Sequence, residues 1–198
     1  MKNRPLATAA ITLSALLALA GCAGTSSGGD MPGMNHGGSS SSAPASADAN
    51  DADIMFASMM KEHHEQAVEM SDMLLSKDGV DERVVALAEE IKAAQEPEIQ
   101  KMEQWLEDWR ADTSGMESMD HGDGMMSEED MKALGDATGA DAGSLFLEQM
   151  IQHHQGAVDM AQEEVDNGQN SDAIALAETI IDAQTTEIAT MKEILATL

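Results

Sequence analysis

Two pairs of adjacent histidines are the chemically most informative feature of the sequence. His63 and His64 lie in the segment Phe56–Met70, and His153 and His154 lie in the matching segment 90 residues later. Seven of the fifteen positions in these two segments are identical, so the chain carries an internal repeat. Imidazole binds transition metals and transfers protons near neutral pH. Either chemistry needs a fold that holds the rings in place.

A glutamate recurs at a matching place after each histidine pair. Glu98 lies in the segment Ala86–Met102 and Glu187 lies in Ala175–Met191, and ten of these seventeen positions are identical at an offset of 89. At helical spacing, each glutamate falls on the same face as the apolar residues of its segment. We therefore expect both carboxyl groups to point towards the protein interior.

Helical spacing also places the histidines. His63 falls at the centre of an apolar stripe, whereas His64 falls at the edge of that stripe. In the second copy His153 takes the inner position. The other stripe residues are Phe56, Met60, Ala67, Met70 and Leu74 in the first copy and Met150, Ala157 and Met160 in the second.

Inward imidazole and carboxyl groups need partners, because burying one unpaired costs several kcal/mol. Two arrangements would supply them. In one, two histidine–glutamate hydrogen bonds hold neighbouring helices in register. In the other, side chains of facing helices form a metal site. The methionines on or near the same faces serve as core residues or as thioether ligands, and they are Met60, Met70, Met102, Met150, Met160 and Met191.

A second group of methionines and histidines lies in polar segments, where the pattern M-x-x-M-x-H-G occurs twice. Exposed methionines in a polar linker have no core to fill. Thioether and imidazole together suit Cu(I), and imidazole also suits Cu(II). The pattern predicts copper binding, and chance in a low-complexity segment is the alternative. The residues are Met31, Met34 and His36, then Met116, Met119 and His121, with Met125 and Met126 close by.

Each half of the repeat predicts two helices joined by a short loop. We expect Asp53 and Asp141 to cap the first helix of each half, and Asp81 and Ser171 to cap the second. Short loops make successive helices antiparallel. The sequence therefore predicts an all-α fold, an antiparallel four-helix bundle made of two repeated hairpins.

Other residues predict where the helices end or deviate. We expect Gly79 and Gly168 to follow the first helices in the left-handed conformation. Ser127 and the acidic residues after it predict a short extra helix. Pro97 lies inside the second helix, where it removes a hydrogen bond at a cost of roughly 3 kcal/mol. A kink or bulge is therefore expected near residues 93–97.

The N-terminal residues resemble a bacterial lipoprotein signal. Lys2 and Arg4 precede an uncharged apolar run from Leu6 to Ala20, which is about 15 residues long and short for a membrane span. The run ends just before Cys22, the single cysteine of the chain. The resemblance implies cleavage before Cys22 and lipidation of its sulfur. An ordinary signal peptide and a free thiol are the alternative.

These features divide the chain. We assign a signal peptide to 1–21, a flexible lipid-anchored linker to 22–52 and a helical domain to 53–198. We expect export and anchoring to the outer face of the cell membrane or in the periplasm. The domain consists of repeat one at 53–110, a linker at 111–126 and repeat two at 127–198.

Composition excludes several classes of function. The 198 residues include 37 Asp and Glu against 10 Lys and Arg, a net charge of −27. This charge argues against nucleic acid as a partner, because phosphate binding needs clustered Lys and Arg. One cysteine excludes an internal disulfide framework and a Cys-rich zinc module. We find no nucleophile–base pair, phosphate-binding loop or nucleotide motif, so the sequence predicts no enzyme.

The repeated segments resemble the bacterial domain-of-unknown-function family 305. The pattern M-x-x-H-H-x-x-A-V-x-M occurs at Met60–Met70 and Met150–Met160, and Q-x-x-E-I-x-x-M follows at Gln95–Met102 and Gln184–Met191. The resemblance implies a ferritin-like four-helix bundle and an exported protein, in a family with copper-binding members. The metal-site residues it implicates are Met60, His63, His64, Met70, Glu98, Met102, Met150, His153, His154, Met160, Glu187 and Met191.

Three functions remain open at this point. The leading hypothesis is a lipid-anchored, extracytoplasmic protein that sequesters or passes on copper. The second is a ferritin-like oxidase, although Met60 and Met150 stand where di-iron bundles carry a glutamate. The third is a metal-free structural or partner-binding bundle. The metal centre of the oxidase alternative would use His63, Glu98, His153 and Glu187.

Overall fold

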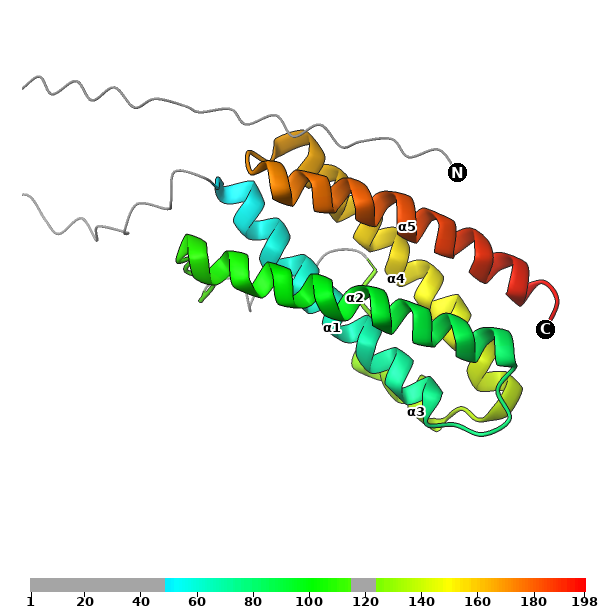
Figure 1. The fold of residues 1–198 in the computed structure, drawn as a ribbon. Coiled ribbons are helices and arrows are strands. Elements are labelled where there is room, and N and C mark those ends of the chain that lie inside the picture. The colour runs from blue at the N-terminus through cyan, green and yellow to red at the C-terminus, as the bar shows by residue number, and fades with distance from the viewer. Residues whose placement is uncertain (1–48, 115–123) are drawn as a thin grey trace, which may run out of the picture. The chain divides into compact units, whose positions relative to one another are not determined.

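The computed structural model of the protein describes residues 49–114 and 124–198. These residues form five α-helices joined by loops and contain no strand, as the predicted all-α fold class requires (Figure 1). None of the described helices is long and apolar enough to cross a membrane. The helices are α1 (Asp51–Leu75), α2 (Glu82–Trp109), α3 (Glu128–Asp136), α4 (Gly139–Asn167) and α5 (Ser171–Leu195).

Several predicted residues lie outside the described part of the chain. They include the signal segment, with its cysteine, and both copies of the linker motif. The residues concerned are Cys22, Met31, Met34, His36, Met116, Met119 and His121. Their predicted roles in lipidation and copper capture stay predictions.

The helix starts depend on short polar side chains. Asp81 caps α2 as predicted. The other three expected caps are wrong, because each lies in the first turn of its helix. Asp53, for example, is the third residue of α1 and completes a capping box with the true cap, Asn50. Acidic residues are favourable in a first turn near the positive end of the helix dipole, so composition alone does not separate cap from first turn. The caps of α4 and α5 are Thr138 and Asn170, in place of the predicted Asp141 and Ser171.

The two predicted left-handed glycines behave differently. Gly79 has φ +78 in the loop after α1, as expected. Gly168 is extended, with φ −66, so its predicted left-handed conformation is wrong. A larger residue at position 168 would collide with Glu164, because a Cβ on Gly168 would lie 2.3 Å from Oε1 of Glu164. The left-handed C-cap in this fold is instead Arg110, with φ 52 after α2.

Pro97 lies inside α2 without ending the helix, which continues from Glu82 to Trp109. Pro97 is exposed, so water can hydrogen-bond to the carbonyl that lost its backbone partner. The expected kink or bulge at this point stays a prediction.

The helices form two hairpins joined through α1 and α4. Helix α2 packs along α1, α5 packs along α4, and α1 also packs against α4 (Figure 1). Helices α1 and α4 run antiparallel. At one end Asn50 Nδ2 donates to the backbone oxygen of Asn167 at 2.9 Å. At the other end the loops at Gly79 and Gly139 meet.

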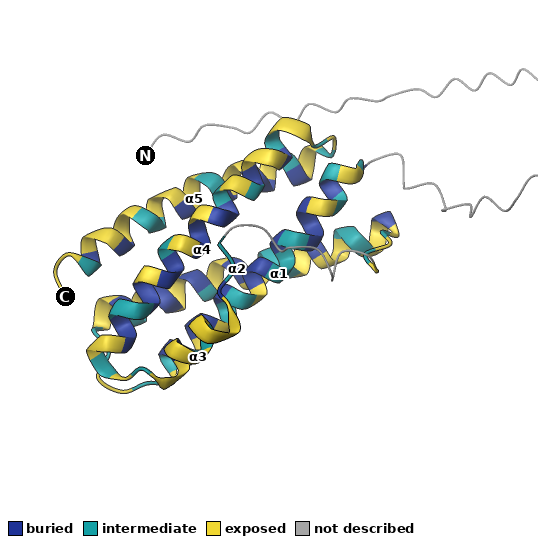
Figure 2. Ribbon diagram, turned by 180° about the vertical axis from the view of Figure 1, so that it is seen from behind, coloured by how far each residue is buried: buried dark blue, intermediate teal, exposed yellow. Residues whose placement is uncertain are grey.

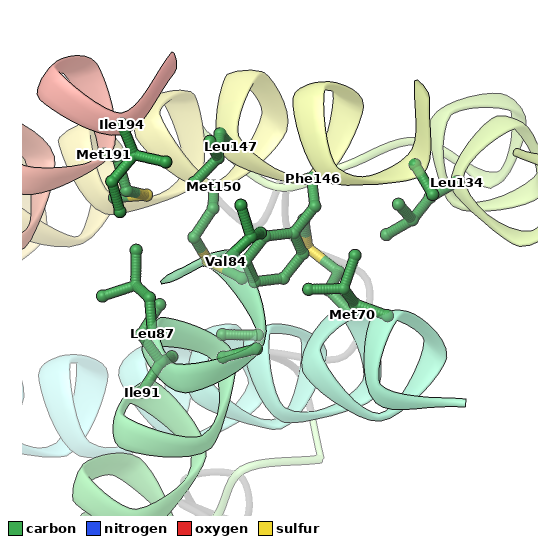
Figure 3. Packing of buried hydrophobic residues seen from close by; sticks show 14 of the residues in the cluster. Met70, Val84, Leu87, Ile91, Leu134, Phe146, Leu147, Met150, Met191 and Ile194 are labelled. Carbon is green, nitrogen blue, oxygen red and sulfur yellow. The ribbon is translucent and has the colours of Figure 1, made fainter. Parts of the chain in front are cut away.

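The core consists of two apolar clusters along the α1–α4 contact. One cluster contains Met70, Phe146 and Met150, which face one another between α1 and α4 (Figure 3). The other contains Met60 and Ile180. The buried faces of the helices point towards these clusters and the exposed faces point outwards (Figure 2). The apolar stripes predicted from helical spacing are therefore the core-facing surfaces.

Helix α3 covers part of the α1–α4 contact. Ser127 opens it with a capping box, as predicted, and Leu134 is fully buried. Met126, just before α3, belongs to the core and is only 7% exposed. Gln66 holds it there, donating from Nε2 to the Met126 oxygen at 2.9 Å and accepting from its N–H at 2.7 Å. The expectation that Met126 is an exposed linker methionine is wrong, because the linker folds back onto α1.

A pair of buried carboxyl groups fixes the start of α1 to the α4–α5 loop. Asp53 Oδ1 accepts hydrogen bonds from the backbone N–H groups of Gln169 and Asn170 at 2.9 and 2.8 Å. Glu164 is 1% exposed beside it. Burial and the neighbouring Asp53 carboxylate raise the pKa of Glu164 to about 8. Glu164 therefore carries a proton in the folded protein at neutral pH.

This pair predicts a loss of stability as the pH rises. The unfolded chain loses the Glu164 proton above a pKa of 4.5, whereas the folded protein keeps it up to about pH 8. The stabilisation is complete below the unfolded pKa and is lost as the pH rises through the folded pKa. We expect this group to lower the free energy of unfolding by up to ~1.4 kcal/mol per pH unit between these values. Urea unfolding at several pH values measures it.

The matched variants are Glu164→Gln and, on the exposed neighbouring position, Glu163→Gln. The first should fall less steeply with pH than the unaltered protein, and the second should follow the unaltered protein. Equal slopes for Glu164→Gln and the unaltered protein would contradict the assignment of the proton to this pair.

Candidate metal centre

Four histidines form a row where α1 and α4 pack together. His63 and His64 come from α1, His153 and His154 come from α4, and each is at most 1% exposed. The rings of His63 and His153 meet at the centre, with 3.7 Å between their centroids and 40° between their planes. The centroids of His153 and His154 are 6.4 Å apart. The repeat thus brings both predicted histidine pairs into one place.

Local sequence explains why the helices bring these rings together. Ala67 and Ala157 follow the inner histidines by four residues and are fully buried. Residues four apart share a helix face, so each histidine is followed by a small side chain on the face that meets the other helix. Gly156 is also buried in α4. Small residues at the contact leave room for the larger imidazole rings.

The outer histidines are held by glutamates from the outer helices. His64 Nε2 lies 2.8 Å from Glu98 Oε2 on α2, and His154 Nε2 lies 2.7 Å from Glu187 Oε2 on α5. A carboxylate oxygen accepts, so Nε2–H is the donor in each pair. In the neutral form of each ring the lone pair is then on Nδ1, and this atom is buried without a partner in both histidines. A carboxylate that orients a histidine in this way is typical of metal ligation.

The ring nitrogens of the inner histidines make no hydrogen bond of ordinary geometry, although the His63 backbone lies close enough to the His153 ring to raise its pKa against the larger effect of burial. Nδ1 and Nε2 of both His63 and His153 are buried and unpaired. Burial, with smaller effects from His64 and His154, lowers the pKa of His63 to about 3. Burial lowers the pKa of His153 well below its usual value too. Both rings are therefore neutral at neutral pH. Each unpaired buried group costs about 1–3 kcal/mol.

The glutamates are the main difference from the expected site. Glu98 and Glu187 were expected to point into the interior near the inner histidines, but both side chains are 21% exposed and bind the outer ones. His64 was expected at the edge of the stripe, and it is fully buried. The oxidase alternative would need His63 to share a metal with Glu98 and Glu187. Among the described residues, no group of three His, Cys, Asp or Glu side chains is placed to hold one metal ion, and this holds for the four histidines of the row as well. A metal ion in the row would therefore have two imidazole ligands, or the side chains would have to move.

The methionines predicted as metal-site residues lie in different surroundings in the structure. Met60 and Met150 lie one turn before the inner histidines and are fully buried. Met160 is only half-buried and lies at the edge of the second cluster. The fully buried methionines that pack in the two apolar clusters are Met60, Met70, Met102, Met150 and Met191. Core packing therefore accounts for these five.

Two further polar residues belong to the repeated Q-x-x-E-I-x-x-M pattern but are not among the predicted site residues. Gln95 and Gln184 are each 3% exposed, and the Oε1 atom of each is buried without a partner. They lie one turn before Glu98 and Glu187. A signal was available, because a glutamine recurs at the same place in both repeats on the core-facing side of the helix.

The described end of the second linker lies against α4 beside the histidine row. A Cβ on Gly124 would lie 2.9 Å from Cα of Gly156 and 3.1 Å from the carbonyl oxygen of Gln152. Gln152 and Gly156 flank His153 and His154 in sequence. Gly124 has φ +109, so both its conformation and its close approach require glycine.

The arrangement favours ligation over acid–base catalysis. Imidazoles whose pKa values lie far below neutral pH are poor proton shuttles, but they carry lone pairs that a metal ion can use without displacing a proton. Neutral imidazole suits copper, zinc, iron and nickel, and nearby thioethers favour copper in its reduced state. The row therefore has the donor chemistry of a site for a borderline or soft cation.

Comparison with known proteins identifies relatives of the same fold. A DUF305 protein from Streptomyces coelicolor is 33% identical over 74% of this chain and 93% of its own, with a TM-score of 0.67. A DUF305 fragment from Deinococcus radiodurans is 29% identical over 76% and 99%, with a TM-score of 0.65. CopM in its Cu(II)-bound form is 34% identical over 73% and 96%, with a TM-score of 0.63. CopM has also been solved in a Cu(I)-bound form. A search of curated proteins gave no match.

The family assignment rests on most of the helical region. The model of the family described as "Domain of unknown function (DUF305)" matches residues 53–195, which include all four histidines of the row. The resemblance seen in the repeated histidine segments is thereby confirmed. The chain is a member of the DUF305 family.

Proposed function

We propose that this protein is a lipid-anchored, extracytoplasmic copper-binding protein that sequesters copper. Its anchor would be Cys22, and its first contacts with copper would be the methionines and histidines of the two linkers. The observation that carries the proposal is the histidine row. Its inner nitrogens are buried and unpaired in a fold shared with CopM, which has been solved with Cu(I) and with Cu(II).

The donor set supports copper over hard cations. Calcium and magnesium take oxygen ligands, and the interior of the α1–α4 contact offers imidazole and thioether instead. The carboxyl oxygens near the row, those of Glu98 and Glu187, already accept from His64 and His154. The net charge of −27 raises the local concentration of any cation, and salt weakens this effect.

The linkers and the histidine row would bind copper at different steps, because they differ in their access to solvent. The row is buried, so an ion reaches it only through local opening of the bundle, which favours retention over fast exchange. Gly124, in the described end of the second linker, lies against the turn of α4 that carries His153 and His154. This position supports transfer of copper from the linker to the row.

The first prediction concerns capture. Replacing His36 and His121 together with alanine is expected to weaken copper binding at least about tenfold, because each removes the imidazole of one linker motif. Competition titration of purified protein with Cu(I) and Cu(II) chelators measures it. If the unaltered protein binds neither ion at about micromolar affinity or tighter and the double variant is unchanged, the proposal fails.

The second prediction concerns the row. The double variant His63→Leu/His153→Leu replaces two unpaired buried groups with apolar ones, so its metal-free form should be as stable as the unaltered protein or more stable. It should also lose much of the rise in thermal midpoint that copper gives, since binding to the folded state stabilises it. Thermal unfolding with and without copper measures both effects.

The control for the row is Leu74→Ile, a volume-conserving change at a fully buried position eleven residues, or about three turns, after His63 on α1. It should keep the copper-dependent rise. If the histidine double variant also keeps the full rise, the row does not bind copper, and linker binding then remains to be judged from the capture experiment alone.

A further inference from the structure

An open groove lies between the first half of α1 and the second half of α4, apart from the histidine row. It has a volume of about 420 Å³. Its walls are apolar near the middle and acidic at the rim. The residues that matter here are Asp51, Met55, Phe56 and Met59 from α1 and Met160 and Glu163 from α4.

Three thioethers line this groove. Met55 and Met59 are four residues apart and therefore lie on one face of α1, while Met160 approaches from α4. Met55 is 43% exposed, and only one other large apolar side chain in the described ranges is as open to solvent. Met59 and Met160 are half-buried. These three residues are open or partly open to solvent, unlike the core methionines.

The internal repeat supplies a comparison, because each methionine of the groove has an equivalent position at the other end of the α1–α4 contact. At an offset of 90, the positions of Met55, Met59 and Met160 correspond to Leu145, Gln149 and Met70. In that copy the equivalent region is covered, since α3 packs on both α1 and α4.

Three contacts hold α3 against α1 and α4 at that end. Leu134 of α3 lies beside Met70 and Phe146 in the core (Figure 3). Gln149 Nε2 donates to the backbone oxygen of Asp130 at 3.0 Å. Lys77 Nζ donates to the backbone oxygen of Gly135 at 2.8 Å. At the covered end, an apolar side chain and an amide side chain therefore hold α3 in place.

The open copy differs at these two α1 positions, where both side chains are methionine. None of the described helices packs on Met55 or Met59. Contact with a covering helix therefore does not explain why both residues are methionine. We propose that Met55, Met59 and Met160 form a separate binding site for one soft monovalent metal ion of the Cu(I) class. The site rests on the proposed function, which it extends from the linkers and the row to the surface of the bundle.

The chemistry of the groove fits such an ion. Thioethers are neutral and soft, so they bind Cu(I) without losing a proton and offer little to hard cations. Asp51 and Glu163 at the rim add attraction for a positive ion. Two of the methionines come from one helix face and the third from the facing helix, so all three line the same groove.

Silver(I) tests the site, because it is a soft monovalent ion that does not change its oxidation state in air. The full-length protein would be labelled with ¹³C in the methionine methyl groups and titrated with Ag(I) by NMR. We expect the methyl signals of Met55, Met59 and Met160 to shift together. In Met55→Leu/Met59→Leu, the Met160 signal should stop responding, and Ag(I) binding in the groove should weaken at least tenfold.

The matched control is Met73→Leu/Met131→Leu, which changes two half-buried methionines that pack at the covered end. It should leave the response of the open groove unchanged. Thermal unfolding of both double variants checks that they are folded, which nearly volume-conserving changes should preserve.

The outcomes separate this site from the proposed function. If other methionine signals respond to Ag(I) while those of the groove stay still, the groove proposal is wrong and the proposed function stands. If no methionine signal responds to Ag(I), the groove proposal is wrong, and the proposed function fails with it only if the chelator titration also shows no copper binding. A Met160 signal that responds equally in the groove double variant also overturns the three-sulfur site.

Discussion

The contact between α1 and α4 is the constraint on which the rest of the structure depends. It joins the two hairpins, and it places His63 against His153 with their ring nitrogens unpaired. An unpaired buried polar group costs about 1–3 kcal/mol, which is large beside a typical net stability of about 5–15 kcal/mol. The apolar clusters on either side must offset this cost. A sequence selected for stability alone would place apolar residues there.

The repeat gives the contact an approximate symmetry, and the chain breaks that symmetry at both ends. At one end α3 and Met126 cover the contact between α1 and α4. At the other end the groove stays open, and the buried pair of Asp53 and Glu164 ties the start of α1 to the α4–α5 loop. The repeat has Gly143 and Leu74 at the positions that correspond to this pair. The connection through two carboxyl groups therefore has no counterpart in the other half of the repeat. The two ends are thus built to differ in access while sharing one backbone plan.

The sequence predicted the helical pattern and the inner histidines because both follow from helical periodicity. It failed where a side chain reaches across to another helix. His64 is placed at the edge of its own stripe by periodicity, yet α2 covers it and supplies Glu98 as its partner. It also failed at Met126, where the linker folds back over α1. Cap positions were misplaced by one to three residues, since neighbouring short polar side chains compete for each cap.

The neutral state of His63 and His153 links the stability of the protein to what the row binds. Its inner imidazoles gain no proton until the pH falls far below neutrality, so no proton competes with a metal ion for their lone pairs. A cation bound there would pair nitrogens that otherwise have no partner, and the fold would recover free energy that the metal-free protein lacks. An apolar substitution recovers the same free energy without any ligand. Packing alone does not account for four imidazoles buried at the α1–α4 contact, two of which make no hydrogen bond of ordinary geometry, and this is the feature that the proposed copper binding would explain.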